Sequence, residues 1–394
     1  MMIRRDDYMD MLHAGKDDND VVKVVTGMRR CGKSTLLEMY MGELIASGIP
    51  ENDIFHLNLE SAEGQTITNH AELNAWLSRI PSDRQTYLLL DEIQNVDGWE
   101  RSVAMIGTMH SCDLYITGSN SKMLSSELST HISGRHVEIR MLPLSFSEYL
   151  RLHPEYDVEH GFELFIRYGS LPGLDPGKGE RYCNEYLEGV YNTVLVKDIM
   201  ERKELRSVRK LNGVARFLYS NIGNTTNDAA VSKSLGINAV TADRYLEGLT
   251  ESLLFHHVER YDIVGRRLMD TNGKYYATDL GMRNAALGGA RGTDISRPVE
   301  NVVFLELLRR GYEPRVGSFR DTEVDFTATR NGETEYFQVT MTMTSPDTRE
   351  REFRPLTGIH DNWRKTIITL DRLGLGSENG IHVVNLYDWL LEKT

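Results

Sequence analysis

The feature that most constrains this chain is a glycine-rich motif near its N-terminus, GMRRCGKS at residues 27–34. Two glycines separated by four residues, with Lys-Ser after the second, are typical of a phosphate loop. Gly27 and Gly32 let the backbone curl so that its N–H groups surround phosphate, and Lys33 reaches the β- and γ-phosphates. Ser34 can hold Mg²⁺. The motif therefore predicts binding of ATP together with Mg²⁺.

Three further residues in and just after this loop are candidates for contact with the nucleotide: Arg30, Cys31 and Thr35. Cys31 has two interpretations, a small side chain tolerated by the loop or a redox switch, and we prefer the first. The other cysteines of the chain are Cys112 and Cys183. Three scattered cysteines are too few for a disulfide framework or a zinc site.

The segments on either side of the loop differ in character. Residues 21–27 form a β-branched run that ends in glycine, and residues 33–46 have helical character. Further β-type runs recur along the chain, with stretches long enough for helices between them, at residues 54–59, 87–90, 114–117 and 137–142. This alternation predicts a parallel α/β sheet covered on both faces.

The apolar run at residues 87–90 ends in two carboxylates, Asp91 and Glu92. A buried central strand would deliver such acids to its C-terminal edge. We expect Asp91 to orient Mg²⁺ and its water, and Glu92 to accept the proton of the attacking water. A surface acidic turn is the alternative, and the four apolar residues before the pair count against it.

A second strand-like run, at residues 114–117, leads into small polar residues, among them Ser119 and Asn120. In ATPases that have a catalytic Glu after the Mg²⁺ aspartate, a further strand lies between the phosphate-loop strand and the acidic strand. Its terminal polar side chain would then face the γ-phosphate, which makes Ser119 or Asn120 the candidate sensor. The alternative is a cap for the next helix.

Arg135 precedes the fifth strand-like run. Charge develops on the transferred phosphoryl group, and an Arg from a neighbouring subunit is a common way to stabilise it. Arg135 is therefore the candidate arginine finger, which would require a homo-oligomer. A structural salt bridge is the alternative.

The length of 394 residues exceeds what one hydrophobic core usually serves. The order of predicted elements divides the chain into a phosphate-loop core at residues 1–155 and a helical lid at 156–210. A winged-helix-like domain at 211–290 and a separate α/β domain at 291–394 follow. The sequence thus predicts four domains.

The winged-helix-like domain is predicted from two short helices. Residues 229–237 supply a first helix and a turn that contains Gly236. A second helix follows, with apolar residues at Val240, Tyr245 and Leu249. This pattern indicates a helix-turn-helix. The β-like runs that would supply a wing are residues 255–258 and 274–278.

The formal net charge of −13 excludes a protein that coats nucleic acid with a uniformly positive surface. Any contact with nucleic acid must therefore be local. Arg206, Arg209 and Lys210 form a basic run just before the winged-helix region and are the candidates for it. A solvated helix face is the alternative.

No apolar run approaches the roughly 18 to 20 residues that a membrane span needs. The N-terminal residues also lack the apolar core of a signal peptide. We therefore expect a cytoplasmic protein with no membrane partner.

Several motifs together resemble a known family. They are residues 23–35, LLDEIQ at 89–94, ITGSNS at 116–121, SGR at 133–135, LPLSFSEY at 142–149, KYY at 274–276, DLG at 279–281 and EVDF at 323–326. The resemblance is to a large bacterial and archaeal family of AAA-type P-loop ATPases that carry a winged-helix region and a C-terminal PD-(D/E)XK nuclease-like domain of unknown function. It implies an AAA-type parallel sheet domain, a helical lid, a winged helix and a nuclease-like α/β domain.

The nuclease chemistry that the resemblance implies can be judged from the residues. Such nucleases need carboxylates from a helix and two strands to hold Mg²⁺, and a Lys beside the last one. Glu300 or Glu306 is the candidate helical acid, and Asp325 is the strand acid. The third strand, however, reads Gln338-Val339-Thr340 where the resemblance calls for Glu-X-Lys. We therefore predict an inactive nuclease fold, unless a lysine from elsewhere, such as Lys365, replaces the missing one.

Three functions are compatible with these motifs. The leading hypothesis is an oligomeric ATPase that acts on DNA, with branched or single-stranded DNA favoured. The alternative is a regulatory switch, in which ATP holds one conformation and protein partners bind the C-terminal domain. An ATP-regulated nuclease is the third. Stimulation of the ATPase rate by DNA separates the first hypothesis from the second.

Overall fold

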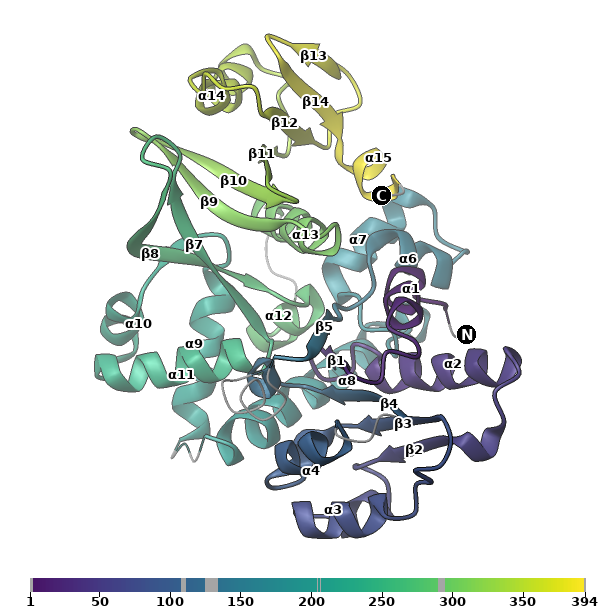
Figure 1. Ribbon diagram of the computed structural model, residues 1–394. Coiled ribbons are helices and arrows are strands. Elements are labelled where there is room, and N and C mark those ends of the chain that lie inside the picture. The colour runs from purple at the N-terminus through teal and green to yellow at the C-terminus, as the bar shows by residue number, and fades with distance from the viewer. Residues whose placement is uncertain are drawn as a thin grey trace. The chain divides into compact units, whose positions relative to one another are not determined.

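The computed structural model describes residues 3–107, 111–124, 134–203, 205, 207–289 and 295–392, apart from the side chains of residues 122, 124, 270 and 271. The chain forms two compact units, which Figure 1 shows coloured from the N-terminus to the C-terminus. The first unit, here the N-terminal unit, comprises Met1–Pro143, Leu171–Gly173 and Glu251–Leu253. The second, the C-terminal unit, comprises Leu144–Ser170, Leu174–Thr250 and Leu254–Thr394.

The N-terminal unit is built on a five-stranded sheet in the order β2-β3-β4-β1-β5, and every neighbouring pair in it is parallel. Its strands are β1 (Val22–Thr26), β2 (Ile54–Asn58), β3 (Thr86–Asp91), β4 (Cys112–Gly118) and β5 (His136–Arg140). Every residue of β1, β3 and β4 is buried, as expected for strands of a parallel sheet covered on both faces. The predicted extra strand is present, because β4 lies between β1 and β3.

Helices cover both faces of this sheet (Figure 1). They are α1 (Asp6–Ala14), α2 (Lys33–Ala46), α3 (His70–Leu77) and α4 (Trp99–Ile106). Alternate strand residues point to opposite faces. Leu88 and Ile116 share one apolar core with Leu73 of α3 and Val103 of α4, whereas Tyr115 contacts Tyr40 of α2 on the other face, with the two rings tilted. The predicted parallel α/β sheet with two covered faces is confirmed.

The C-terminal unit contains a nine-stranded sheet in the order β13-β14-β12-β11-β10-β9-β7-β8-β6. Its strands are β6 (Thr225–Thr226), β7 (Phe255–Asp262), β8 (Arg267–Ala277), β9 (Glu313–Phe319), β10 (Thr322–Arg330), β11 (Glu333–Thr340), β12 (Arg364–Thr369), β13 (Gly376–Glu378) and β14 (Ile381–Asn385). Its helices are α6 (Phe146–Leu152), α7 (Val158–Tyr168), α8 (Glu180–Thr193), the π-helix η6 (Val194–Glu201), α9 (Val208–Ser220), α10 (Asp228–Leu235), α11 (Ala239–Glu251), α12 (Leu280–Leu287), α13 (Ser296–Arg309), α14 (Pro346–Thr357) and α15 (Leu386–Leu391).

One strand pairing joins the two halves of this sheet. β7 pairs in parallel with β9, with Arg260 opposite Val316 and Asp262 opposite Ser318. The sheet therefore continues across the predicted domain border at residue 290. The finer division of the chain at residues 155, 210 and 290 stays a prediction.

The predicted helix pair is present as α10 and α11, and the turn between them contains Gly236 in the left-handed region (φ 63°). Tyr245 and Leu249 are buried, as expected, but Val240 is 73% exposed. The buried stripe of α11 runs through Ala242, Tyr245, Leu246 and Leu249, a spacing of one helical face. Val240 lies two residues before this stripe and so points away from it, which corrects its placement on the apolar face.

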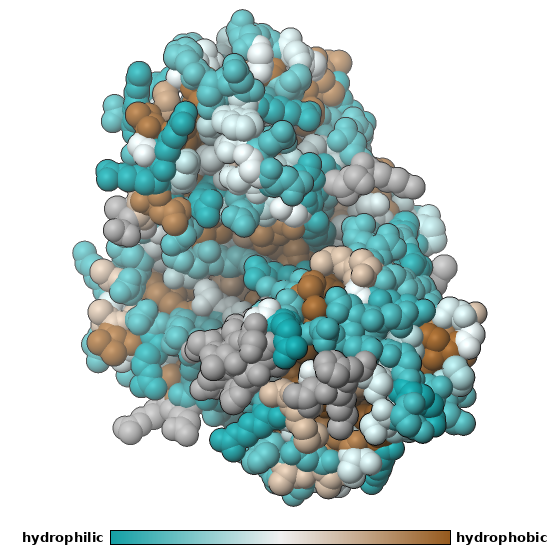
Figure 2. All heavy atoms as spheres, viewed as in Figure 1, coloured by the Kyte–Doolittle hydropathy of each residue, from teal (hydrophilic) through white to brown (hydrophobic). Residues whose placement is uncertain are grey.

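Within the described ranges, none of the helices combines the length and the apolar character that crossing a bilayer requires. Figure 2 shows that hydrophilic residues predominate over the face in view, with hydrophobic ones interspersed among them.

Candidate nucleotide-binding site

The phosphate loop connects β1 to α2, and its two glycines are required for different reasons. A Cβ atom on Gly27 would lie 2.5 Å from the carbonyl oxygen of Met141 and 2.7 Å from the sulfur of Cys31. Gly32 has φ 108°, a conformation that residues with a side chain rarely adopt. Any larger residue at either position would displace the loop backbone that is expected to surround phosphate.

Lys33 is the first residue of α2 and is buried, with 3% of its surface exposed. Its Nζ donates to the carbonyl oxygens of Gly27 (3.1 Å) and Met28 (3.3 Å) and lies 3.1 Å from Oε1 of Glu92. Burial alone would lower the pKa of Lys33, but the Glu92 carboxylate outweighs it and raises this pKa. The ammonium is therefore charged at neutral pH and is held inside the loop.

Asp91 ends β3 and is fully buried. Its Oδ1 accepts from Oγ1 of Thr117 (2.5 Å) and its Oδ2 accepts from Nδ2 of Asn58 (3.0 Å). The Ser34 side chain also hydrogen-bonds this carboxylate. Burial raises the pKa of Asp91, and the bonds from Ser34 and Thr117 oppose that rise.

The structure thus brings together Ser34 and Asp91, the two predicted Mg²⁺ ligands. A hydroxyl and a carboxylate supply the oxygen ligands that Mg²⁺ prefers, usually beside several waters. Asn58 and Thr117 were missed by the sequence reasoning. The signal that could have found them is their position at or near the C-terminal ends of β2 and β4, the strands on either side of β3.

Glu92 follows β3 in a left-handed backbone conformation, with φ 56°. Its N–H donates to Oγ1 of Thr117 (2.9 Å), and its side chain contacts Lys33 through Oε1 and the amide of Gln94 through Oε2. Burial by itself would raise the pKa of Glu92, but the Lys33 ammonium and the Gln94 amide outweigh it and lower this pKa. Glu92 is therefore ionised at neutral pH, as a proton acceptor must be.

Ser119 and Asn120 follow β4 directly and are buried, with 1% and 6% of their surfaces exposed. Oγ of Ser119 accepts from Nε2 of Gln94 at 3.3 Å. Because β4 lies between β1 and β3, both residues belong to the sheet edge that carries the phosphate loop. A short 3₁₀ helix begins at Ser121, so the alternative role as a helix cap stays open for Asn120.

The other predicted loop residues differ in exposure. Arg30 is exposed and has φ 68°, and Thr35 is half-buried in the first turn of α2. Cys31 is fully buried, and burial raises the pKa of its thiol. A buried thiol with a raised pKa is poorly reactive, which favours a small side chain in the loop over a redox switch.

Arg135 is exposed and lies just before β5. Its carbonyl oxygen accepts from the N–H of Val22, the first residue of β1. Because β1 and β5 are parallel, Arg135 lies at the N-terminal edge of the sheet, opposite the edge that carries the phosphate loop. The five residues of β1 separate the two edges by about 16 Å, so Arg135 cannot serve the site of its own chain.

Of the basic run, Arg206 lies outside the described residues. Arg209 and Lys210 lie in the first turn of α9 in the C-terminal unit, and both are exposed.

A second cluster of charged side chains, here the Lys274 cluster, lies in the C-terminal unit. Nζ of Lys274 on β8 lies 3.1 Å from Oε1 of Glu300 on α13 and 2.8 Å from Oε1 of Glu323 on β10. The Tyr276 hydroxyl donates to Oε1 of Glu300 at 2.7 Å. Burial, followed by the Glu300 carboxylate, raises the pKa of the nearby Asp325 to about 8. Lys274 itself is 1% exposed.

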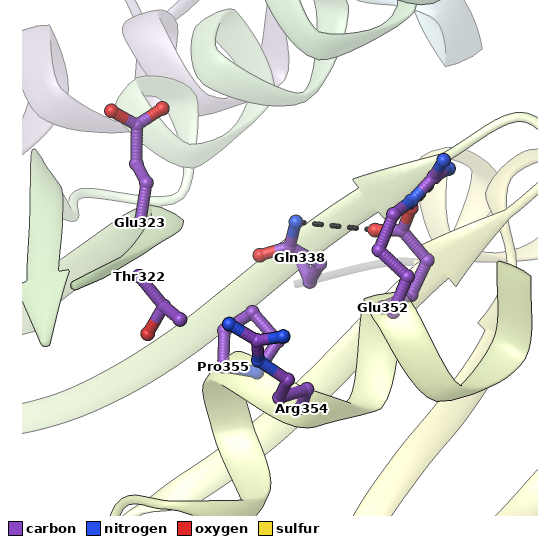
Figure 3. A pocket seen from close by; sticks show the side chains of 7 residues that line it. Thr322, Glu323, Gln338, Glu352, Arg354 and Pro355 are labelled. Carbon is purple, nitrogen blue, oxygen red and sulfur yellow. Dashed lines mark hydrogen bonds and ion pairs between the residues drawn. The ribbon is translucent and has the colours of Figure 1, made fainter. Parts of the chain in front are cut away.

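Gln338 on β11 lies between this cluster and α14. Its Oε1 accepts from the N–H of Asp325 (3.3 Å), and its Nε2 donates to Oε2 of Glu352 (3.2 Å), a bond that Figure 3 draws. Gln338 and Glu323 line an open cavity of about 310 Å³. The cavity's other lining residues are Thr322, Arg351, Glu352, Arg354 and Pro355 (Figure 3).

The structure also decides between the nuclease candidates. Glu300 belongs to the Lys274 cluster, whereas Glu306 pairs with Arg310 at 2.9 Å. Lys365 donates to Oδ1 of Asp361 (3.1 Å) and to two backbone carbonyl oxygens. The lysine at the carboxylates is therefore Lys274, which corrects the suggestion of Lys365. Among the residues described, no three His, Cys, Asp or Glu side chains are grouped so that they can hold a metal ion.

Comparison with known proteins adds family membership to this geometry. An uncharacterized protein of Haemophilus influenzae is 35% identical over an alignment 402 positions long, which covers 99% of this chain and 99% of that one. The chain belongs to the same family. Another relative, an uncharacterized protein of Methanocaldococcus jannaschii, is 28% identical over 332 residues, 77% of this chain and 71% of that one.

The family domains match in two places. Residues 19–150 match an AAA domain and residues 160–292 match a domain of unknown function (DUF8612). The first match coincides with the parallel sheet and the phosphate loop, so the P-loop AAA-type assignment is confirmed. The matches do not address the winged-helix and nuclease-like assignments, which stay predictions.

Two solved structures are among those with a similar fold. The Aeropyrum pernix ORC1 protein in complex with DNA is 11% identical, with 73% of this chain and 92% of that chain covered and a TM-score of 0.34. AMPPCP-bound DnaA from Aquifex aeolicus is 12% identical, with 64% and 90% covered and a TM-score of 0.33. Overlaps this low carry no functional argument.

Proposed function

We propose that this protein binds ATP with Mg²⁺ and hydrolyses it. One observation carries the proposal: the Lys33 ammonium pairs with Glu92 and the Ser34 side chain hydrogen-bonds Asp91, all at the edge of the sheet where β1, β4 and β3 end. These are the cation, the hydroxyl and the two carboxylates that phosphoryl transfer to water requires.

Each residue has a distinct part in the proposed reaction. The loop N–H groups and Lys33 bind the phosphates. Ser34 and Asp91 would hold Mg²⁺, which supplies charge neutralisation at the phosphate oxygens. Glu92 accepts the proton of the attacking water, because it is ionised and lies beside the loop lysine.

Without nucleotide, Lys33 is engaged by Glu92 and by two carbonyl oxygens of its own loop. Phosphate is a stronger acceptor than either carbonyl, since it carries charge. ATP binding therefore exchanges the partners of Lys33, and this exchange frees one oxygen of Glu92 for water.

We further propose that the ATPase acts on DNA. The support is local positive charge: Arg209 and Lys210 are exposed on α9, in the same unit as α10 and α11. At physiological salt a charge farther away than about 8 Å is largely screened, so an exposed basic turn can bind phosphate on a protein of net charge −13. Binding should then be moderate and strongly dependent on salt.

A single set of measurements tests both proposals. ATP binding and phosphate release are measured with Mg²⁺, in the presence and absence of single-stranded, duplex and branched DNA at about 50 mM salt. We expect hydrolysis by the protein alone and stimulation by DNA, reduced in the Arg209→Ala/Lys210→Ala variant, whose hydrolysis without DNA is unchanged. Absence of ATP binding would reject the ATPase, and hydrolysis without DNA binding would favour the regulatory switch.

The position of Arg135 supports action in trans, since its own phosphate loop lies at the other edge of the sheet. If Arg135 completes the site of a neighbouring subunit, inactive Arg135→Ala and inactive Lys33→Ala proteins should regain activity when mixed. Each supplies what the other lacks at mixed interfaces. If mixed assemblies are demonstrated and activity does not return, the alternative interpretation of Arg135, a structural salt bridge, would be favoured.

A further inference from the structure

Gln94, which belongs to the short 3₁₀ helix η3 (Ile93–Asn95), connects the two sides of the candidate site. Its Nε2 donates to Oε2 of Glu92 and to Oγ of Ser119. A carboxylate only accepts hydrogen bonds, so the amide nitrogen, not the amide oxygen, must face Glu92. The orientation of the Gln94 side chain is therefore set by its chemistry.

The other end of the amide has no such partner. Oε1 of Gln94 is buried and has no hydrogen-bond partner among the described residues. A buried acceptor without a donor is costly and is often associated with a functional site. Among the described residues, the hydrogen bonds of the amide are those to Glu92 and Ser119.

Three residues, two at the end of β4 and one just after it, surround this connection. Thr117 accepts the N–H of Glu92 and so fixes the start of its side chain. A Cβ on Gly118 would lie 1.8 Å from the sulfur of Met123 and 2.4 Å from Oε1 of Gln94, so the glycine makes room for both side chains. Ser119 then supplies the second acceptor.

The two oxygens of Glu92 depend on different groups. Oε1 faces Lys33 and Oε2 faces Gln94. Once phosphate engages Lys33, the contact of Gln94 is the remaining described side-chain contact that holds the carboxylate. We propose that Gln94 is a positioning residue, which keeps Glu92 aligned after ATP binds and ties it to Ser119 at the candidate sensor position.

This inference rests on the proposed ATPase function. It connects Ser119, the candidate sensor after β4, to Glu92, the proposed proton acceptor. A shift of Ser119 would move the Gln94 amide, and the amide would move the Glu92 carboxylate. A misplacement of about 1 Å at such a site costs about 100-fold in rate. The effect should therefore fall on kcat and not on nucleotide affinity.

The test compares three variants of the full chain in Mg²⁺-ATP hydrolysis and in equilibrium ATP binding. Gln94→Ala removes the amide, and Gln94→Glu keeps its shape but replaces the donor with a carboxylate. Asn95→Ala, an exposed neighbour in the same turn, is the control. We expect kcat to fall about 10- to 100-fold in both Gln94 variants, with KM and the ATP dissociation constant within about twofold of wild type, and no change in the control.

A further variant separates positioning from general structural damage. Ser119→Ala should lower kcat, and the Gln94→Ala/Ser119→Ala double variant should lose little more than the worse single variant, because the two residues act as a unit. Fully multiplicative effects would overturn the connection. If Gln94→Ala does not fold, the kcat of Gln94→Glu, a variant of matched size, decides whether Gln94 positions Glu92.

The outcomes also distinguish this inference from the function beneath it. An active wild type with unchanged kcat in Gln94→Glu overturns the role of Gln94 and leaves the ATPase intact. A raised KM at constant kcat assigns Gln94 to nucleotide binding instead. A wild type that binds no ATP removes the proposed function, and the inference with it.

Discussion

Lys33 in the N-terminal unit and Lys274 in the C-terminal unit are both buried lysines paired with carboxylates, and they are held in different ways. Lys33 in the N-terminal unit is 3% exposed and has one carboxylate partner, Glu92, besides two carbonyl oxygens of its own loop. Lys274 in the C-terminal unit is 1% exposed and bridges two carboxylates, Glu300 and Glu323.

The difference shows when the partners of a buried lysine can be replaced by a ligand. The partners of Lys33 come from a loop and from a residue just after a strand, and each can be replaced by a phosphate oxygen. The partners of Lys274 come from α13 and β10, and Tyr276 holds one of them with a further hydrogen bond. An ammonium fixed between carboxylates already supplies the positive charge that a metal would bring, so we predict that the Lys274 cluster is a structural element.

The largest effects are expected at Lys33 and Glu92. Lys33→Ala should lose ATP binding, because the ammonium contacts phosphate in the ground state. Glu92→Gln should still bind ATP but hydrolyse it about 10²- to 10⁴-fold more slowly, because the carboxylate acts when water attacks. ATP titration and single-turnover hydrolysis measure the two quantities. An equal loss of ATP affinity in both variants would contradict the roles assigned to them.

The next effect, on stability, sharpens the comparison. Lys274→Met removes the cation that Glu300 and Glu323 share. Glu300 then keeps only Arg297 as a cationic partner among the described residues, and the free energy of unfolding should fall by about 3–5 kcal/mol. Lys33→Met removes the cationic partner of one carboxylate, Glu92, which keeps its hydrogen bond from the Gln94 amide. This variant should therefore lose less free energy of unfolding. Urea denaturation of both variants measures the difference. Lys274→Met/Glu300→Gln should recover part of the loss, and no recovery would show that the charge is not its cause.

A smaller effect concerns pH. The pKa of Asp325 in the folded protein, about 8, lies above the ordinary value of about 4. The folded protein therefore holds a proton that the unfolded chain has lost, and the free energy of unfolding falls as pH rises between these values.

Asp325→Asn cannot lose that proton. The free energy of unfolding of Asp325→Asn, relative to that of wild type, should therefore rise from pH 6 to pH 8 by at most about 1.4 kcal/mol per pH unit. The pKa of Glu92 is lowered instead, so its stabilisation is lost only in acid, and Glu92→Gln should show no such slope from pH 6 to pH 8. Urea denaturation across this range compares the two, and parallel curves for Asp325→Asn and wild type would contradict the raised pKa.

The smallest expected effect is none. Because Lys274 occupies the carboxylates and Gln338 is a neutral side chain, Mg²⁺ or Mn²⁺ should not induce cleavage of single-stranded, duplex or branched DNA. Nicking assays with the Lys33→Ala variant exclude an ATP-dependent contribution. Reproducible nicking that Asp325→Ala abolishes would show that the cluster is a working nuclease site, with Lys274 in place of the missing lysine.

Much of the N-terminal unit could be predicted from the sequence, because its signals are local. The glycines and Lys33 of the loop stand at fixed spacing, and apolar runs end at Asp91 and before Ser119, so strand, loop and acid positions follow from neighbours in the chain. The position of β4 between β1 and β3 was also expected. In the C-terminal unit, the helix pair α10 and α11 and parts of β7 and β8 were predicted from the sequence, whereas the pairing of β7 with β9 was not.

The sequence by itself therefore determined the parallel sheet, the phosphate loop and the acids that follow β3, since each depends on residue types at short, regular spacing. Only the tertiary structure decided the partners. Thr117 meets Asp91, Gln94 meets Ser119, and Lys274 meets Glu300 through strand order, register and helix packing, which act between residues 25 to 26 positions apart. Lys365 was named from the sequence only as an example of a replacement lysine, and the structure places Lys274 at these carboxylates instead. A buried charge pairs according to position in space, which no local pattern records.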